Sequence, residues 1–231
     1  DIEKMTPVDI NLYKTANLQE TGANSYGEEE TYSEKIKEDS RKPISYTLEE
    51  NDFDMKKLKD VIEVPVYEIN NFTWENTLGN VTPKVREQFP MMKLETPEQI
   101  MKISDYNRIA KLYGNKEYTL EDDEYLIVAN YKSIANIRNM GLRENTIINI
   151  NGKEYKPKYQ ECQDGFIEIS TSHTNVGIII VPDSTNFKEE DQKLWFLAAN
   201  YNANNDEEKK AIENIFSDEN SNLVKKLNNM N

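Results

Sequence analysis

The chain has a single histidine and a single cysteine, so few of its residues could carry out nucleophilic or metal chemistry. His173 lies in a polar stretch, residues 170–175, and the serines beside it lack the glycine pattern of a nucleophile elbow. Cys162 lies next to Glu161 and near Asp164, and such carboxylates raise the pKa of a thiol, which makes it a poor nucleophile. One histidine and one cysteine cannot supply the usual ligands of a zinc site. The sequence therefore predicts no catalytic residue and no metal-binding residue.

Two acidic clusters, residues 121–124 and residues 189–191, could offer oxygen ligands to calcium. Neither has the Asp-x-Asp-x-Asp-Gly spacing of a calcium loop, so solvated faces are the better interpretation. Paired-carboxylate chemistry, as in glycoside hydrolysis, stays open because 42 acidic residues are present, but no spacing singles out a pair. No glycine-rich phosphate loop occurs, so the chain is not an ATP-hydrolysing part. We expect no cofactor, and the ligand-binding residues cannot be named.

The composition restricts the partners of the chain. A net charge of −14, from 42 acidic and 28 basic residues, argues against nucleic acid and favours cationic partners. The longest apolar run, residues 176–181, is far shorter than the ~20 residues that cross a bilayer. The first residue is Asp1, with no signal-peptide pattern after it, so we expect a soluble fragment of a longer protein.

The clearest local pattern is a helix, a turn and a strand within residues 103–131. Ser104 is the expected N-cap of the helix, and Gly114 follows its last turn. The apolar face of this helix consists of Tyr106, Ile109, Ala110 and Tyr113. The strand, residues 125–128, is short and rich in residues that favour β structure.

Weaker patterns predict the elements of the first half of the chain. Alternating apolar residues indicate a strand at 8–12, and a thin apolar stripe indicates a surface helix at 28–40 with three glutamates at its start. Further expectations are a strand at 44–47, a helix at 53–60, a strand at 61–69 with Pro65 at an edge or bulge, and an irregular connection at 71–99 that packs by its aromatic residues.

In the second half, Asn151 and Gly152 separate two strand-like runs, which is the strongest short-range signal for a hairpin with a type I′ turn. A short helix is expected at residues 133–140, ending at Gly141. We expect further strands at 166–169, 177–181 and 192–201, and a last helix at 207–227 capped by Asp206.

The pattern Ser104-Asp105-Tyr106-Asn107-Arg108, followed by Leu112, Gly114, Leu120 and Asp123-Glu124-Tyr125-Leu126, resembles the extracytoplasmic domain of FtsX-like (MacB-type) ABC transporter permeases of Gram-positive bacteria, of the bacitracin- and lantibiotic-resistance type. The resemblance covers residues 100–182, and the segments 19–42 and 70–99 have no counterpart in it. It implies a domain on the extracellular face of the cell membrane, joined to transmembrane helices of its own parent chain. A separate cytoplasmic ATPase subunit would drive it. The implied ligand is an antimicrobial peptide, cationic or lipid-linked.

The expected fold class is α+β, with mixed or antiparallel sheets and peripheral helices. We expect residues 1–70 with 203–231 to form a membrane-proximal subdomain and residues 100–202 a compact one. The first strand and the last helix should then leave the domain on the same side, within roughly 20 Å. A free-standing secreted or surface-anchored α+β binding module is the alternative, and a hydrolase is a weaker one.

Overall fold

The computed structural model describes residues 8–23, 26–129, 131–165, 177–202 and 224–226, together with 206, 207, 209, 210 and 214. It confirms the α+β fold class. The chain divides into two compact units, unit 1 (Asp1–Pro65 with Gln192–Asn231) and unit 2 (Val66–Asp191). The boundaries therefore differ from the expected ones at 70 and 203. Among the residues described, no helix is both long enough and apolar enough to cross a lipid bilayer.

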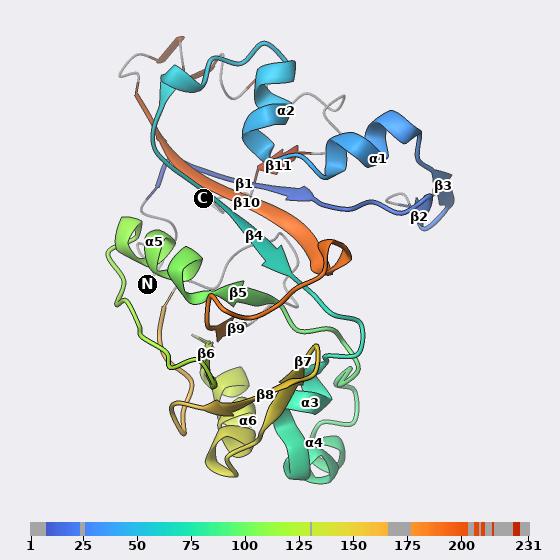
Figure 1. The fold of residues 1–231 in the computed structure, drawn as a ribbon, viewed down its shortest axis with the longest axis vertical. Helices are drawn as coiled ribbons and strands as arrows, with labels where there is room; N and C mark the ends of the chain where they lie inside the picture. Colours follow the sequence, from blue (N-terminus) through green and yellow to red (C-terminus); the bar gives the residue numbers. More distant parts are fainter. Residues whose placement is uncertain are drawn as a thin grey trace. The chain divides into compact units, whose positions relative to one another are not determined.

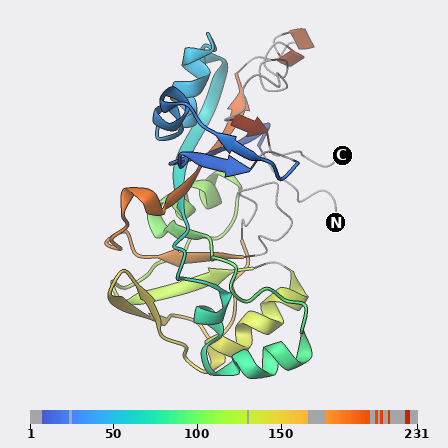
Figure 2. The same ribbon diagram turned by 90° about the vertical axis from the view of Figure 1, so that its right-hand side faces the viewer.

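Unit 1 is built around an open sheet with one helical layer (Figures 1 and 2). Its strand order is β11-β1-β10-β4, formed by β11 (Val224–Lys226), β1 (Ile10–Thr15), β10 (Gln192–Tyr201) and β4 (Leu58–Tyr67), whose last residues belong to unit 2. The helices of this unit are α1 (Glu34–Ser40), α2 (Ile44–Glu50) and the 3-10 turn η2 (Met55–Lys57), and a separate ribbon pairs β2 (Thr21–Ala23) with β3 (Glu29–Thr31). One face of the sheet and α2 enclose the core, which includes Ile10, Leu12, Ile44, Leu48, Phe53, Leu197 and Ala199.

Several expectations for unit 1 were wrong because side chains from elsewhere decide the local structure. Residues 44–47 form the start of α2, since the Glu63 carboxylate on β4 accepts hydrogen bonds from the amides of Ile44 and Ser45. Helix α1 begins only at Glu34, where Ser33 caps it, so the glutamates at 29 and 30 lie in β3 instead.

The helix expected at 53–60 is also wrong, because it reduces to η2 and β4 already begins at Leu58. The strands expected at 8–12, 61–69 and 192–201 are confirmed as β1, β4 and β10, with shifted ends for the first two. In the last helix expected at 207–227, residues 207, 209, 210 and 214 are helical, whereas residues 224–226 form β11 and the other positions lie outside the described residues.

Unit 2 contains a mixed sheet with helices on its sides (Figure 1). The order β5-β9-β6-β8-β7 comprises β5 (Ile100–Lys102), β9 (Ile178–Val181), β6 (Glu124–Val128), β8 (Lys153–Pro157) and β7 (Ile148–Ile150). The pairs β5–β9 and β6–β8 are parallel, whereas β6–β9 and β7–β8 are antiparallel. The helical elements are α3 (Trp74–Leu78), η3 (Gly79–Val81), α4 (Thr82–Gln88), α5 (Ile103–Leu112), α6 (Lys132–Arg143) and η4 (Glu189–Asp191).

The helix-turn-strand prediction is confirmed as α5 and β6, and Asp105, Lys111 and Gly114 hold their expected places. The expected cap was wrong: Lys102 occupies the N-cap position, and the Asp183 carboxylate accepts hydrogen bonds from the amide (3.1 Å) and hydroxyl of Ser104. The helix therefore begins where the loop after β9 supplies an acceptor.

The Asn151-Gly152 hairpin is confirmed, with φ values of 49° and 92° that suit a type I′ turn. Strand β9 is confirmed as a central strand, buried throughout between β5 and β6. The strand expected at 166–169 lies outside the described residues.

Two expectations for the helices of unit 2 were wrong. The stretch 71–99 is not irregular, because α3, η3 and α4 occupy much of it. Helix α6 does not end at Gly141 but continues to Arg143. A Cβ at Gly141 would lie 2.4 Å from the backbone oxygen of Thr77, so this glycine allows α6 to approach α3 closely.

Candidate functional site

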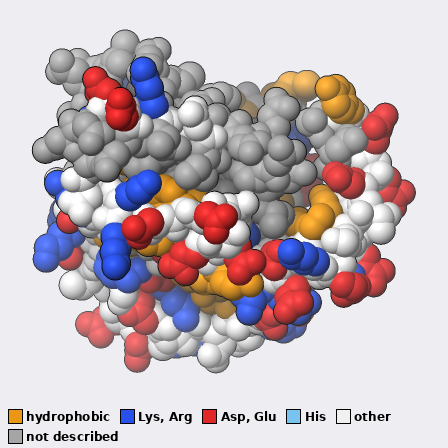
Figure 3. Space-filling view, turned by 90° about the horizontal axis from the view of Figure 1, so that it is seen from above, with side chains coloured by type: hydrophobic (Ala, Val, Ile, Leu, Met, Phe, Trp, Pro, Cys, Tyr) orange, Lys and Arg blue, Asp and Glu red, His pale blue; other side chains and the backbone are white. Residues whose placement is uncertain are grey.

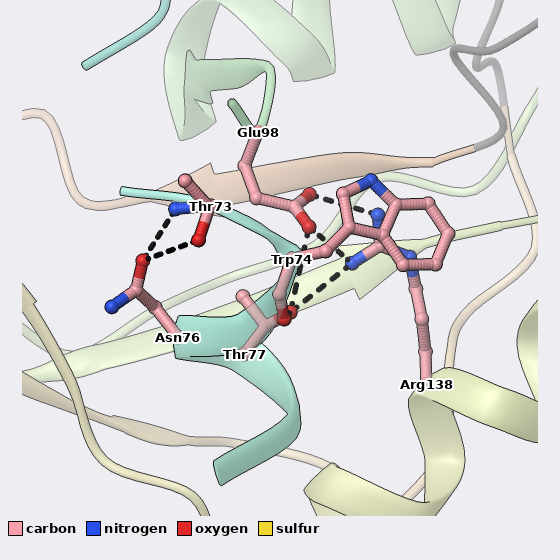
Figure 4. A network of polar contacts seen from close by, with 6 residues as sticks. All are labelled: Thr73, Trp74, Asn76, Thr77, Glu98 and Arg138. Carbon is pink, nitrogen blue, oxygen red and sulfur yellow. Dashed lines mark hydrogen bonds and ion pairs between the residues drawn. The ribbon is translucent and has the colours of Figure 1, made fainter. Parts of the chain in front are cut away.

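The most unusual chemical group in unit 2 is a buried ion pair between Arg138 on α6 and Glu98 just before β5 (Figure 4). Both side chains are only 1% exposed. The guanidinium donates two hydrogen bonds to the carboxylate, from Nη1 to Oε1 at 3.0 Å and from Nη2 to Oε2 at 2.8 Å. This forked geometry is the strongest way in which arginine binds a carboxylate.

Helix α3 supplies the other groups around this pair. The guanidinium carbon of Arg138 lies 3.8 Å from the centre of the Trp74 ring, which is a close cation–π contact. The Thr77 hydroxyl donates to the backbone oxygen of Trp74 at 2.9 Å and accepts a longer bond from Arg138 Nη1 at 3.4 Å. A capping box between Thr73 and Asn76 fixes the first turn of α3, so that the indole faces the ion pair (Figure 4).

The electrostatics of the pair indicate a structural role. Burial raises the pKa of Glu98, while the Arg138 charge and its hydrogen bonds oppose that shift. The carboxylate oxygens are directed at Arg138 and Thr77, and solvent does not reach them. A general acid or base must meet its substrate within hydrogen-bond reach, which this enclosed carboxylate cannot do. The pair therefore fixes α6 and α3 to the segment that leads into β5.

This cluster was not predicted from the sequence, although one signal for it was present. Arg138 lies one helical turn after Ile134 and one before Leu142, and both neighbours contribute to apolar clusters. A charged residue on the apolar face of a helix needs a buried partner. No comparable signal marks Glu98, which lies in a polar stretch between Pro97 and Gln99.

The residues weighed for chemistry from the sequence are not brought together. His173 lies outside the described residues. Cys162 is partly buried, and burial raises the pKa of its thiol to about 11, which agrees in direction with the expected poor nucleophile. Within the described parts of the chain, no three metal-ligating side chains gather to hold an ion.

The two acidic clusters have ordinary structural surroundings. In the first, Glu121 to Asp123 are exposed, and Asp123 forms an exposed ion pair with Lys156 at 3.5 Å. In the second, Asp191 is buried and accepts hydrogen bonds from the amide of Lys188 and the side chain of Asn151. The first cluster is a solvated face, as expected, whereas the expectation was wrong for Asp191, which is buried and hydrogen-bonded.

On the face shown in Figure 3, charged and apolar side chains of the described residues are mixed. In the face shown in Figure 3, red acidic and blue basic side chains alternate, with small orange apolar patches between them. Of the large apolar side chains in the described residues, Met91 (92%) in unit 2 and Tyr26 (88%) in unit 1 are the most exposed. The acidic side chains drawn in colour on this face therefore do not form one block.

The first and last strands described are neighbours at one edge of the unit 1 sheet. Strand β11 pairs antiparallel with β1, and Leu12 lies opposite Lys226 while Lys14 lies opposite Val224. The incoming end of β1 and the outgoing end of β11 therefore lie at the same end of the strand pair. Adjacent strands are about 5 Å apart, so the start of β1 and the end of β11 lie within a short distance of each other.

Comparison of the chain with protein-family models, with curated proteins and with solved structures found no match. The resemblance to the permease domain therefore rests on the pattern of residues in α5 and β6. The buried ion pair and the pairing of β1 with β11 are the structural features from which a function has to be argued.

Proposed function

We propose that this chain is a non-catalytic extracytoplasmic domain of an FtsX-like ABC transporter permease, which binds or senses a ligand and couples it to a cytoplasmic ATPase subunit. The ligand class that fits is a cationic or lipid-linked antimicrobial peptide, because the chain carries a net charge of −14. No described residue is assigned to the ligand, and the domain itself carries out no reaction.

The pairing of β1 with β11 is the observation that carries this proposal. A domain inserted between two membrane-spanning segments must receive and return the chain at nearby points on one side. The antiparallel register of Leu12 with Lys226 meets that requirement, as expected from the resemblance, although a strand at 224–226 takes the place of the C-terminal end of the expected helix. Closely spaced ends of this kind also allow a domain to be inserted into, or removed from, a host chain.

The first experiment is to sequence the parent reading frame on both sides of the chain. We expect apolar segments of ~20 residues before Asp1 and after Asn231, because those segments would anchor the inserted domain. A signal peptide on one side and a stop codon on the other would overturn the proposal. The secreted or surface-anchored binding module would then take its place.

The second experiment tests coupling in the intact transporter. Residues 10–226 are replaced by a short Gly-Ser linker, which can bridge the strand spacing of about 5 Å without pulling on the flanking segments. We expect basal ATP hydrolysis to remain and stimulation by a cationic peptide to be lost. The matched control is the Met91→Ala variant, which removes an exposed side chain and should keep both. Stimulation that survives the deletion would exclude a coupling role.

A further inference from the structure

The chain passes between the two units twice, after Pro65 and after Asp191. Inside unit 2 the two segments next to these crossings are joined by a backbone hydrogen bond. The amide of Glu68 donates to the carbonyl oxygen of Asp191 at 2.8 Å. Glu68, near the start of unit 2, and Asp191, at its end, are therefore held side by side.

A third segment fastens this junction. Asn151, at the turn of the β7–β8 hairpin, donates from Nδ2 to the backbone oxygen of Asn186 at 2.9 Å and to Oδ2 of Asp191 at 3.0 Å. The same Asp191 oxygen accepts the Lys188 amide at 2.8 Å. Asp191 is 7% exposed, so its carboxylate depends on these donors. One side-chain amide thus binds two points of the loop 186–191.

The loop is also held from the side of β4. The Phe187 ring stacks on the Tyr67 ring with a centroid distance of 3.9 Å and an angle of 7° between the planes. Tyr67 is the last residue of β4 and directly precedes Glu68. The loop 186–191 is therefore bound both to the incoming segment of unit 2 and to the hairpin turn.

The conformation of the turn explains why asparagine suits this position. Asn151 has a φ of 49°, a left-handed conformation that asparagine tolerates better than most residues. The turn has its own support, because the Gly152 amide donates to Oδ1 of Asn149 at 3.0 Å. The bonds that form the turn and the bonds that grip the loop are thus made by different residues, and they can be separated by mutation.

We infer that the Asn151 side chain acts as a latch: its hydrogen bonds hold the first segment of unit 2, at Glu68, and the last segment, loop 186–191, in place together. When the latch is closed, loop 186–191 and the Glu68 amide are held together. When it opens, the buried Asp191 carboxylate loses a donor and both crossings are loosened in one step. The inference concerns unit 2 alone and does not depend on the proposed transport function.

The test is amide hydrogen exchange at Glu68 and Lys188, followed by NMR in the whole chain. The Asn151→Asp variant keeps the shape of the turn but places a second carboxylate about 3 Å from that of Asp191, where like charges repel. We expect exchange at both amides to become at least about tenfold faster, since a local opening is made easier. Unchanged exchange at Glu68 would overturn the inference.

Three further variants make the result specific. Asn149→Ala weakens the turn without touching the loop, and it should leave the Glu68 amide within about twofold of wild type. An Asn149→Ala effect as large as that of Asn151→Asp would overturn the latch. The double variant Asn151→Asp/Asp191→Asn removes the repulsion between the two carboxylates but leaves the Asn186 carbonyl without its donor, so we expect it to restore only part of the protection. If Asn151→Asp does not fold, Asn151→Gly keeps the positive φ and removes the grip, and it is judged by the same criterion.

Discussion

Among the residues that the structure describes, each unit buries one long cationic side chain, and the two units satisfy it in different ways. In unit 2, Arg138 is matched by the carboxylate of Glu98 and by the face of Trp74. In unit 1, Lys14 on β1 is 0% exposed and donates from Nζ to the backbone oxygens of Asp39 (2.6 Å) and Lys42 (2.7 Å) and to the Thr47 hydroxyl (2.7 Å). The Arg138 guanidinium is thus paired with a carboxylate, whereas the Lys14 ammonium is hydrogen-bonded to neutral oxygens, two of which are backbone carbonyls.

This difference assigns the two cations to different structural tasks. The carbonyls bound by Lys14 lie at the C-terminal end of α1, where the helix dipole is negative. Glu63 binds the amides at the start of α2, where the dipole is positive. One buried cation and one carboxylate therefore fix the α1–α2 corner to the sheet. Arg138 instead joins α6, α3 and the segment before β5 through side chains alone.

The largest effect should come from breaking the ion pair on one side. Arg138→Met leaves the Glu98 carboxylate buried without a partner, and we expect a loss of about 3–5 kcal/mol in the free energy of unfolding. Urea denaturation at pH 7 measures it. The control is Arg138→Met/Glu98→Leu, which should recover most of the loss because no charge remains buried. A double variant as unstable as the single one would show that packing against Trp74 matters more than charge.

Lys14→Met should lower the free energy of unfolding by less, about 2–3 kcal/mol, because it leaves neutral oxygens without a donor and leaves no buried carboxylate without its cation. The loss should be local to the α1–α2 corner. Hydrogen exchange should therefore accelerate at residues 34–50 and remain unchanged in α6. The comparison between the two cations fails if α6 responds equally.

Gly141→Ala should cost about 1–2 kcal/mol. Alanine favours a helix interior by about 1 kcal/mol, but the added methyl would lie 2.4 Å from the Thr77 carbonyl oxygen and must push α3 away. This displaces Trp74 from Arg138, so thermal unfolding and indole fluorescence should change together. Gly114→Ala serves as a contrast, since no atom lies within 4 Å of its added Cβ and only the positive φ opposes it.

The smallest effect is a pH dependence that only the lysine can show. Burial lowers the pKa of Lys14 to about 8, against the opposing charges of Asp39 and Glu63. Above pH 8 the unfolded chain binds this proton more tightly than the folded one, so stability relative to Lys14→Met should rise with pH. The expected gain between pH 7 and pH 9 is about 1 kcal/mol. A difference that is flat or falls over this range would contradict the shift.

Local signals were sufficient to predict the type and approximate position of elements that have a clear apolar spacing or a characteristic turn sequence. The apolar spacing in α5, the Asn151-Gly152 turn and the continuous apolar run of β9 all predicted the observed structure. The turn owes its form to residues within a few positions of one another, whereas the start of α5 also depends on the distant Asp183.

Prediction failed where a distant group decides the outcome. Residues 44–47 looked like a strand, but the Glu63 carboxylate on β4 makes them the start of a helix. Gly141 looked like a helix end, but it is the point where α6 meets the Thr77 carbonyl. The ion pair of Arg138 and Glu98 joins residues forty positions apart. The position of Arg138 on an apolar helix face indicates that a buried partner exists, but no local pattern identifies Glu98 as that partner.

The division of the chain also sets an order for folding during synthesis. Unit 2 is one continuous stretch of the chain, and β9 is the last of its strands to be made. It can therefore begin to fold on the ribosome as soon as β9 has emerged. Strand β1 is made first but pairs with β10, which follows unit 2, and with β11 later still. Among the described strands, β1 is therefore the one that waits longest for its partners, and the sheet of unit 1 is completed last.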